Sequence, residues 1–374
     1  MDNITVSQWN DMITKTLIPN IVILSIYVVL GTCGNVLVLS VYSFQMKGLS
    51  DERYFIPILA VFDMVVTIYC GLFLIIQCFN QVTFSNNILC KTAQFFVGLT
   101  TFIPILLLLI IAVQRYLKVC MPYKPVMSLR VKRIALILTI VISLICAFPL
   151  PFVYGSVPFH SVNYGINGTN CGKLKEGHQL ARAVYAIVIG FLAVATVTTL
   201  IVLYSRIGCT VYRQFKLNKS NSNRVEVGKS ETKTDDEKVS EVGQNGGIQT
   251  PVTSDGDSNI SNTNIVKNHQ TTLSGSKRRQ KSNRRITHKL TIMFFVITLV
   301  FVLSYLPKVV LLIIEGLYED FWEKLSNTRR PGVMFIYQMF IINNIVNPFI
   351  YAFMDIKFRK EATLFLDRVF HCKF

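Results

Sequence analysis

Residues 54–79 read YFIPILAVFDMVVTIYCGLFLIIQCF and carry one charged side chain, that of Asp63. The low charge continues beyond this stretch, so the whole run Tyr54–Cys90 holds no second charge. A helix needs about 20 mostly apolar residues to cross the hydrocarbon layer of a membrane. The apolar residues here are continuous, whereas a strand of a membrane barrel would alternate apolar and polar positions. The stretch therefore predicts a transmembrane helix.

Six further runs have the same character, and Lys308 is the one charged residue among them. They are Thr16–Met46, Thr92–Gln114, Ile134–Gly172, Ala183–Ser205, Leu290–Ile314 and Pro331–Met354. The composition agrees, because only 16% of the residues are charged, whereas a soluble domain carries about 25%. We therefore predict an all-α membrane protein, in which a bundle of seven transmembrane helices occupies residues 19–354.

The net charge of +17 predicts the orientation of the bundle. Lysine and arginine collect in the segments 115–133, 277–289 and 357–360, whereas the segment 79–91 has only Lys91. Short loops rich in these residues stay on the cytoplasmic side. We expect a multi-pass protein of the plasma membrane with its N-terminus outside. Nucleic acid is not an expected partner, because the basic residues flank apolar spans and do not form a separate basic domain.

The segments outside the spans are predicted from their composition. Residues 1–18 are polar, lack the pattern of a cleavable signal peptide and are expected to be an extracellular N-terminus. Residues 216–285 are rich in Ser, Asn, Thr and Gly, which is typical of a disordered segment, here the third cytoplasmic loop. Residues 355–374 are expected to form an amphipathic helix over Asp355–Val369 and a cytoplasmic tail.

Three residues are candidates for covalent modification, two on the predicted outer side and one in the cytoplasmic tail. Asn3 and Asn167 begin Asn-x-Thr sequons on the predicted outer side, where glycosylation takes place. Cys372 follows the amphipathic helix and is a candidate for palmitoylation, with a plain free thiol as the alternative.

Among the polar residues inside the spans, three suggest a common network. Asn35, Asp63 and Asn347 stand in the first, second and seventh runs, and polar side chains at such depth are costly. We expect them to form one interior polar network. The alternative is a set of ordinary interhelical hydrogen bonds, worth about 0.6 kcal/mol each on average. Because no C-x-x-C pair and no cluster of His, Cys and carboxylates occurs, the sequence predicts no enzyme, metal or cofactor site.

Motifs in these spans, taken in order, resemble those of the rhodopsin-like (class A) G-protein-coupled receptor family, and in character those of its peptide receptors. The resemblance covers nearly the whole chain outside residues 216–285. Its motifs are Gly34-Asn35-Val36, Leu59-Ala60 with Asp63, Cys90, Arg115-Tyr116, Cys171, Tyr204, Phe301 with Ser304-Tyr305 and Pro307, Asn347-Pro348-Phe349-Ile350-Tyr351, and Phe358-Arg359.

The resemblance implies a role for each motif. Cys90 and Cys171 would form a disulfide on the oxidising side. Pro307 would kink the sixth helix, since proline removes a backbone hydrogen bond, and the inner end of that helix would swing outward on activation. Arg115 and Tyr116 would then engage a heterotrimeric G protein. The residues expected to rearrange with them are Tyr204, Asn347, Pro348 and Tyr351.

The sequence departs from the family pattern at two positions that concern signalling. Gln114 stands where an acidic residue usually precedes the arginine, so we expect a weakly held resting state and raised basal signalling. A decoy receptor that binds ligand without coupling is the alternative, and a seven-span transporter is a more distant one. Pro104 replaces a serine of the usual sodium site, which argues against a sodium ion near Asp63.

Two residues argue against particular classes of ligand. Val97 stands where amine receptors of the family have an aspartate, and Ile341 stands where opsins have the retinal-binding lysine. Lys308 follows the kink proline and is expected, together with Tyr305, Val97 and Gln94, to line the ligand site. It would anchor a carboxylate, with pairing inside the receptor or outward snorkelling as the alternative. A peptide is the expected ligand, and lipids and small acids remain open.

Overall fold

In a computed structural model, the structure describes residues 4–46, 53–123, 127–161, 164–174, 179–231, 261–318 and 320–370. The chain divides into two compact units, one made of residues 1–205 and 289–374 and the other of residues 206–288. Asn3 and Cys372 lie outside the described residues, so their modification stays a prediction.

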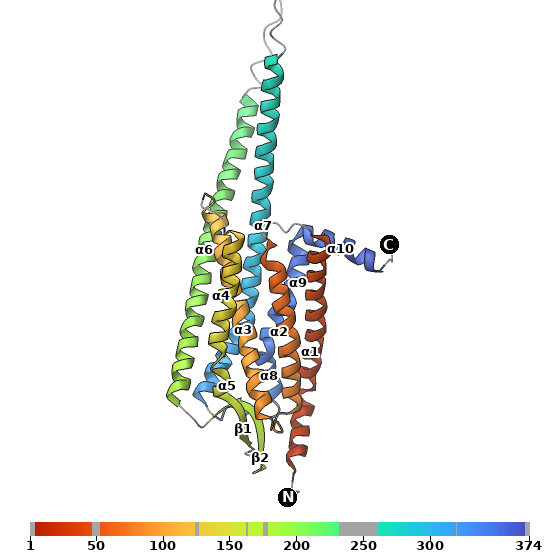
Figure 1. The fold of residues 1–374 in the computed structure, drawn as a ribbon, viewed down its shortest axis with the longest axis vertical. Helices are drawn as coiled ribbons and strands as arrows, with labels where there is room; N and C mark the ends of the chain where they lie inside the picture. The colour runs from red at the N-terminus through yellow and green to blue at the C-terminus, as the bar shows by residue number, and fades with distance from the viewer. Residues whose placement is uncertain are drawn as a thin grey trace, which may run out of the picture. The chain divides into compact units, whose positions relative to one another are not determined.

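The described residues contain seven helices long and apolar enough to cross a membrane, which confirms the predicted fold class. The elements in chain order are α1 (Val6–Ser40) with a π-helical turn (Val41–Gln45), α2 (Phe55–Phe79), α3 (Asn87–Cys120), α4 (Leu129–Ala147), the short α5 (Leu150–Val153), β1 (Tyr154–His160), β2 (Asn167–Lys173), α6 (Gln179–Glu231), α7 (Ser261–Leu317), α8 (Arg330–Gln338), η3 (Met339–Ile341), α9 (Ile342–Met354) and α10 (Ile356–Phe370). The last span is thus built from α8, η3 and α9. In the first unit, the N-terminus and the strands lie at one end of the bundle and α10 lies at the other (Figure 1).

Helix α1 begins well before the apolar run that predicted it. Thr5 and Gln8 form a capping box, in which the Thr5 hydroxyl accepts from the Gln8 amide and the Gln8 side chain accepts from the Thr5 amide. Trp9, Ile13 and Leu17 then recur every four residues on one face and are buried. Most of the segment expected to be an N-terminal tail is therefore the first turns of this helix.

The strands β1 and β2 form an antiparallel hairpin that the sequence did not predict. The turn contains Gly165 at φ 65°, a conformation that suits glycine. The hairpin lies close against the α2–α3 connection, where the Thr169 amide donates to Val82 O at 2.8 Å. A Cβ on Gly168 would collide with that same carbonyl oxygen. The close approach therefore requires a glycine at this position.

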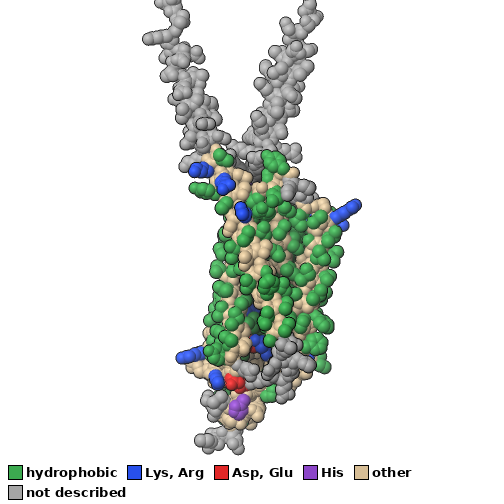
Figure 2. Space-filling model, turned by 90° about the vertical axis from the view of Figure 1, so that its left-hand side faces the viewer, with side chains coloured by type: hydrophobic (Ala, Val, Ile, Leu, Met, Phe, Trp, Pro, Cys, Tyr) green, Lys and Arg blue, Asp and Glu red, His purple; other side chains and the backbone are tan. Residues whose placement is uncertain are grey.

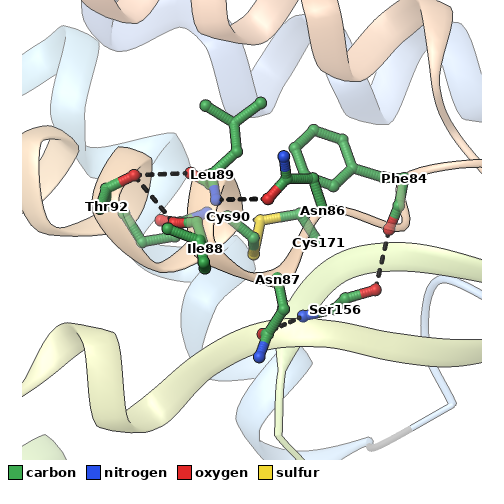
Figure 3. The surroundings of a disulfide bond; sticks show 10 residues. Phe84, Asn86, Asn87, Ile88, Leu89, Cys90, Thr92, Ser156 and Cys171 are labelled. Carbon is green, nitrogen blue, oxygen red and sulfur yellow. Dashed lines mark hydrogen bonds between the residues drawn. A yellow bond between two sulfur atoms is a disulfide. The ribbon is translucent and has the colours of Figure 1, made fainter.

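A disulfide between Cys90 and Cys171 ties the hairpin to α3 and confirms the pairing expected from the resemblance. Figure 3 shows the contacts around it. The Asn86 side chain caps α3 by accepting from the Leu89 amide at 2.9 Å, and the Ser156 hydroxyl donates to Phe84 O at 2.9 Å. The hairpin is thus anchored by one covalent bond and several hydrogen bonds at the same end of α3.

Hydrophobic side chains cover much of the face of the bundle that Figure 2 shows. Large apolar residues such as Ile145, Phe191 and Ile313 are exposed in the structure. In water such a surface would be a patch for association, but here it forms the band that a lipid bilayer requires.

Two helices extend further than the composition predicts. Helix α6 continues to Glu231 and α7 begins at Ser261, so both enter the segment 216–285 that was expected to be disordered. Adding a turn to an existing helix needs no new nucleation, which is why polar residues can continue it. Residues 232–260 lie outside the described residues. The amphipathic helix after the last span is confirmed as α10, with Phe358 and Ala362 buried on its inner face.

Candidate functional site

A small cavity lies within the bundle towards the hairpin end. It is lined by side chains of α2, α3, α7, α8 and η3: Cys70, Phe73, Leu74, Gln77, Gln94, Val97, Lys308, Tyr337 and Phe340. The structure thus brings together three of the four residues expected to bind ligand. The fourth, Tyr305, does not line the cavity but packs against Phe340, which does, with 5.7 Å between the ring centroids.

Lys308 is the charged side chain of this cavity. Its residue is only 7% exposed, and its Nζ lies 3.6 Å from the centroid of the Phe340 ring and 5.2 Å from that of Tyr337. A cation over an aromatic face gains electrostatic energy from the ring, up to about 2 kcal/mol when water is excluded. No ion pair joins Lys308 to another residue in the described part of the chain.

Other charged side chains at the hairpin end of the bundle are engaged. Lys173, the last residue of β2, lies 3.7 Å from Glu315 on α7. Arg330 is buried and donates through Nη2 to Trp322 O at 2.9 Å and to Leu325 O at 3.2 Å. The Trp322 ring in turn packs edge-on against Tyr337, which lines the cavity.

Tyr154, at the start of β1, adds a neutral polar group. Burial raises the pKa of its phenol well above the usual 10, and the nearby Glu315 carboxylate acts in the same direction. Tyr154 therefore keeps its proton at physiological pH.

The interior polar residues meet in the middle of the bundle. Asn347 Nδ2 donates to Asp63 Oδ2 at 2.6 Å, and Asn35 Nδ2 donates to Asn344 O at 2.9 Å. Two separate hydrogen bonds therefore join α1 and α2 to α9, and a single network through all three expected residues stays a prediction. Asp63 Oδ1 and Asn347 Oδ1 are buried without a protein donor, as groups bridged by water would be. Pro104 of α3 has no side-chain oxygen that could bind a sodium ion near Asp63. The expectation that no sodium ion binds there stays a prediction.

Towards the α10 end, α3 contacts α7 through Arg115. The Arg115 side chain is fully buried, and its guanidinium carbon lies 4.7 Å from the centroid of the Phe294 ring. Tyr204 donates to Phe294 O at 3.2 Å and lies 3.0 Å from the Thr298 hydroxyl. Phe294 is thus a shared partner that sequence reasoning missed, since nothing in an apolar helix distinguishes it from its neighbours.

The other expected coupling residues lie near this end. Tyr116 is half-buried, and Tyr351 is buried with its ring edge-on to Phe358 of α10. Arg53 forms a bidentate ion pair with Asp355, with Nε–Oδ2 at 2.8 Å and Nη2–Oδ1 at 3.0 Å. Nothing in the sequence indicated this pair, because its members stand 302 positions apart.

Known proteins resemble the chain in sequence and in fold. The sequence profile of the family described as "7 transmembrane receptor (rhodopsin family)" matches residues 34–351. A cholecystokinin receptor of Xenopus laevis is 23% identical over 350 residues, which cover 91% of this chain and 75% of the relative. The crystal structure of squid rhodopsin superimposes with a TM-score of 0.64 at 17% identity, covering 100% of this chain and 89% of the other. At that identity the rhodopsin likeness concerns the fold alone.

Proposed function

The chain belongs to the rhodopsin family of seven-transmembrane receptors, and from this premise we propose that it transmits the binding of an extracellular peptide to heterotrimeric G proteins. The family consists of multi-pass membrane receptors. The hairpin end is taken as the extracellular end, for which two observations speak. The disulfide lies there, as disulfides belong to oxidising compartments. Asn167, in the sequon of β2, is exposed there and available to a glycan.

One observation carries the proposal. Helix α7 supplies both a residue that lines the cavity and a residue that packs over Arg115. Lys308 of α7 lines the cavity, and Phe294 of the same helix packs on Arg115 at the other end of the span. Pro307 interrupts the backbone hydrogen bonds between them, next to the cavity. An outward swing of the inner half of α7 would uncover Arg115 for a G protein, while Tyr204 and Tyr351 rearrange around it.

A peptide ligand is supported by two features. The curated relative is a receptor for cholecystokinin by name, and the hairpin forms a broad, anchored surface beside the cavity. In the proposal Lys308, Gln94 and Val97 contact the ligand directly, and Tyr305 responds to it through Phe340. Decoy function is the second candidate, favoured by Gln114 alone.

Ligand-free nucleotide exchange tests coupling without a known ligand. The purified receptor in lipid nanodiscs is mixed with representatives of each G-protein class, and the exchange rate is compared with that of Arg115→Ala. Faster exchange with at least one class, lost in Arg115→Ala, is the expected result. If neither the ligand-free receptor nor the receptor with pooled neuropeptides accelerates exchange on any class, the coupling proposal is wrong and decoy function replaces it.

A further inference from the structure

Lys308 is a buried cation that forms no ion pair in the described part of the chain. The residue is more than nine-tenths buried at the wall of the cavity, and its contacts in the described part of the chain are with the faces of Phe340 and Tyr337. A cation at membrane depth is costly unless an anion or water meets it. The ring contacts offset part of this cost. An anionic group of a ligand would offset the remainder.

The acidic residue that could balance Lys308 from its own helix is already engaged. Glu315 lies two turns, about 10 Å, further along α7. It forms its ion pair with Lys173, which is itself fixed close to α3 because the disulfide-bonded Cys171 is two residues away. Arg330 is likewise engaged with backbone carbonyls. Lys308 is therefore the charged group at this site that is open to a partner.

We propose that Lys308 binds a carboxylate of the ligand in this cavity, whose free volume of about 10 Å³ admits one oxygen-sized group, and that an apolar or aromatic group of the ligand lies at the cavity opening. A single lysine balances one negative charge, whereas a phosphate group would leave a further buried charge uncompensated. The amide groups of Gln77 and Gln94, which also line the cavity, supply neutral donors for the second carboxylate oxygen. Phe73 and Phe340 provide the apolar surface. A C-terminal carboxylate or an acidic side chain next to an aromatic residue has this chemistry.

The inference rests on the proposed function only in taking the hairpin end as the ligand-binding end, and its test does not require a G protein. Purified receptor in nanodiscs is titrated with N-acetyl derivatives of Phe, Tyr and Leu, each as the free acid and as the matching amide. Thermal stability of the receptor reports binding, because a ligand that binds the folded state raises the unfolding temperature. We expect the acids to stabilise the receptor and the amides to have little effect.

Variants separate recognition from folding. Lys308→Met removes a charge-assisted hydrogen bond, so it should weaken binding of the acids by at least about tenfold and abolish the preference of acid over amide. Lys308→Arg keeps the charge and should keep the preference. Lys324→Gln, which removes an exposed charge that does not line the cavity, is the matched control and should also keep it. A merely structural role of Lys308 would change the stability of the free receptor but not the difference between acid and amide.

Two results would overturn the inference. One is an equal effect of every acid and its amide on the wild-type receptor, including no effect from either. The other is an acid preference that survives in Lys308→Met. If Lys308→Met does not fold, Lys308→Gln replaces it, and loss or retention of the acid preference decides in the same way. If the receptor fails to accelerate nucleotide exchange but keeps its preference for acids, the coupling proposal is refuted and the carboxylate site is not.

Discussion

The contact between Arg115 and Phe294 predicts how firmly the receptor is held at rest. Replacing Phe294 with Leu removes the aromatic ring beneath the guanidinium but leaves the backbone carbonyl that accepts from Tyr204. Because Arg115 is fully buried and 4.7 Å from the ring centroid, the contact belongs at the strong end of the range for a cation and a ring, about 2 kcal/mol. If the contact exists only in the closed state, its loss raises the ratio of active to resting receptor by up to about 30-fold.

The assay is ligand-free nucleotide exchange at matched receptor density. Phe294→Leu should raise the basal rate, and Met293→Leu, a change at the buried neighbour without a ring, should leave it near the wild-type value. Gln114→Asp, which restores the acidic neighbour of Arg115, should lower it. A basal rate in Phe294→Leu equal to or below that of the wild type would refute the view that this ring holds the resting state.

Three further outcomes are expected. Arg53→Ala breaks a buried ion pair and should lower the free energy of unfolding by about 3–5 kcal/mol. Lys324→Ala removes an exposed ion pair and should lower it by less than about 1 kcal/mol. Thermal unfolding in nanodiscs measures both changes. Asn167→Gln should remove a glycan detected by the mobility shift on deglycosylation, and an unaltered shift would contradict the extracellular placement of that sequon. Gly168→Ala should push the hairpin from its neighbouring loop and lower surface expression, unlike Gly190→Ala, where a Cβ meets open space.

The sequence predicts the bundle well because membrane spans are signalled by composition alone. A run such as 54–79 must be a helix in lipid, since all its backbone polar groups have to be satisfied within the segment. The hairpin was missed for the opposite reason. Tyr154–His160 continues an apolar run without charge, and its pairing with Asn167–Lys173 depends on contacts with the α2–α3 connection that lie far away in sequence.

Some residues of the candidate site could likewise be predicted from the sequence, and others could not. Lys308 and Asp63 could be singled out because a charge in an apolar run is conspicuous. Phe340, Tyr337 and Phe294 could not, because an aromatic residue in a span is ordinary until its neighbours are known. Their importance comes from the cations that rest on them, and only the fold brings ring and cation together.

The proposed mechanism depends on which contacts differ between the resting and active states, because a ligand shifts an equilibrium only by its differential affinity. In the structure α7 is attached to α3 at one end of the span and to β2 of the hairpin at the other. At the inner end Phe294 packs on Arg115 directly, and at the outer end Glu315 pairs with Lys173, which the disulfide holds near α3. Lys308 lies between these attachments and beside Pro307. A carboxylate that draws the Lys308 ammonium away from Phe340 would therefore act where the helix is weakest, and a small displacement there would be amplified along the roughly 21 Å that separate Lys308 from Phe294.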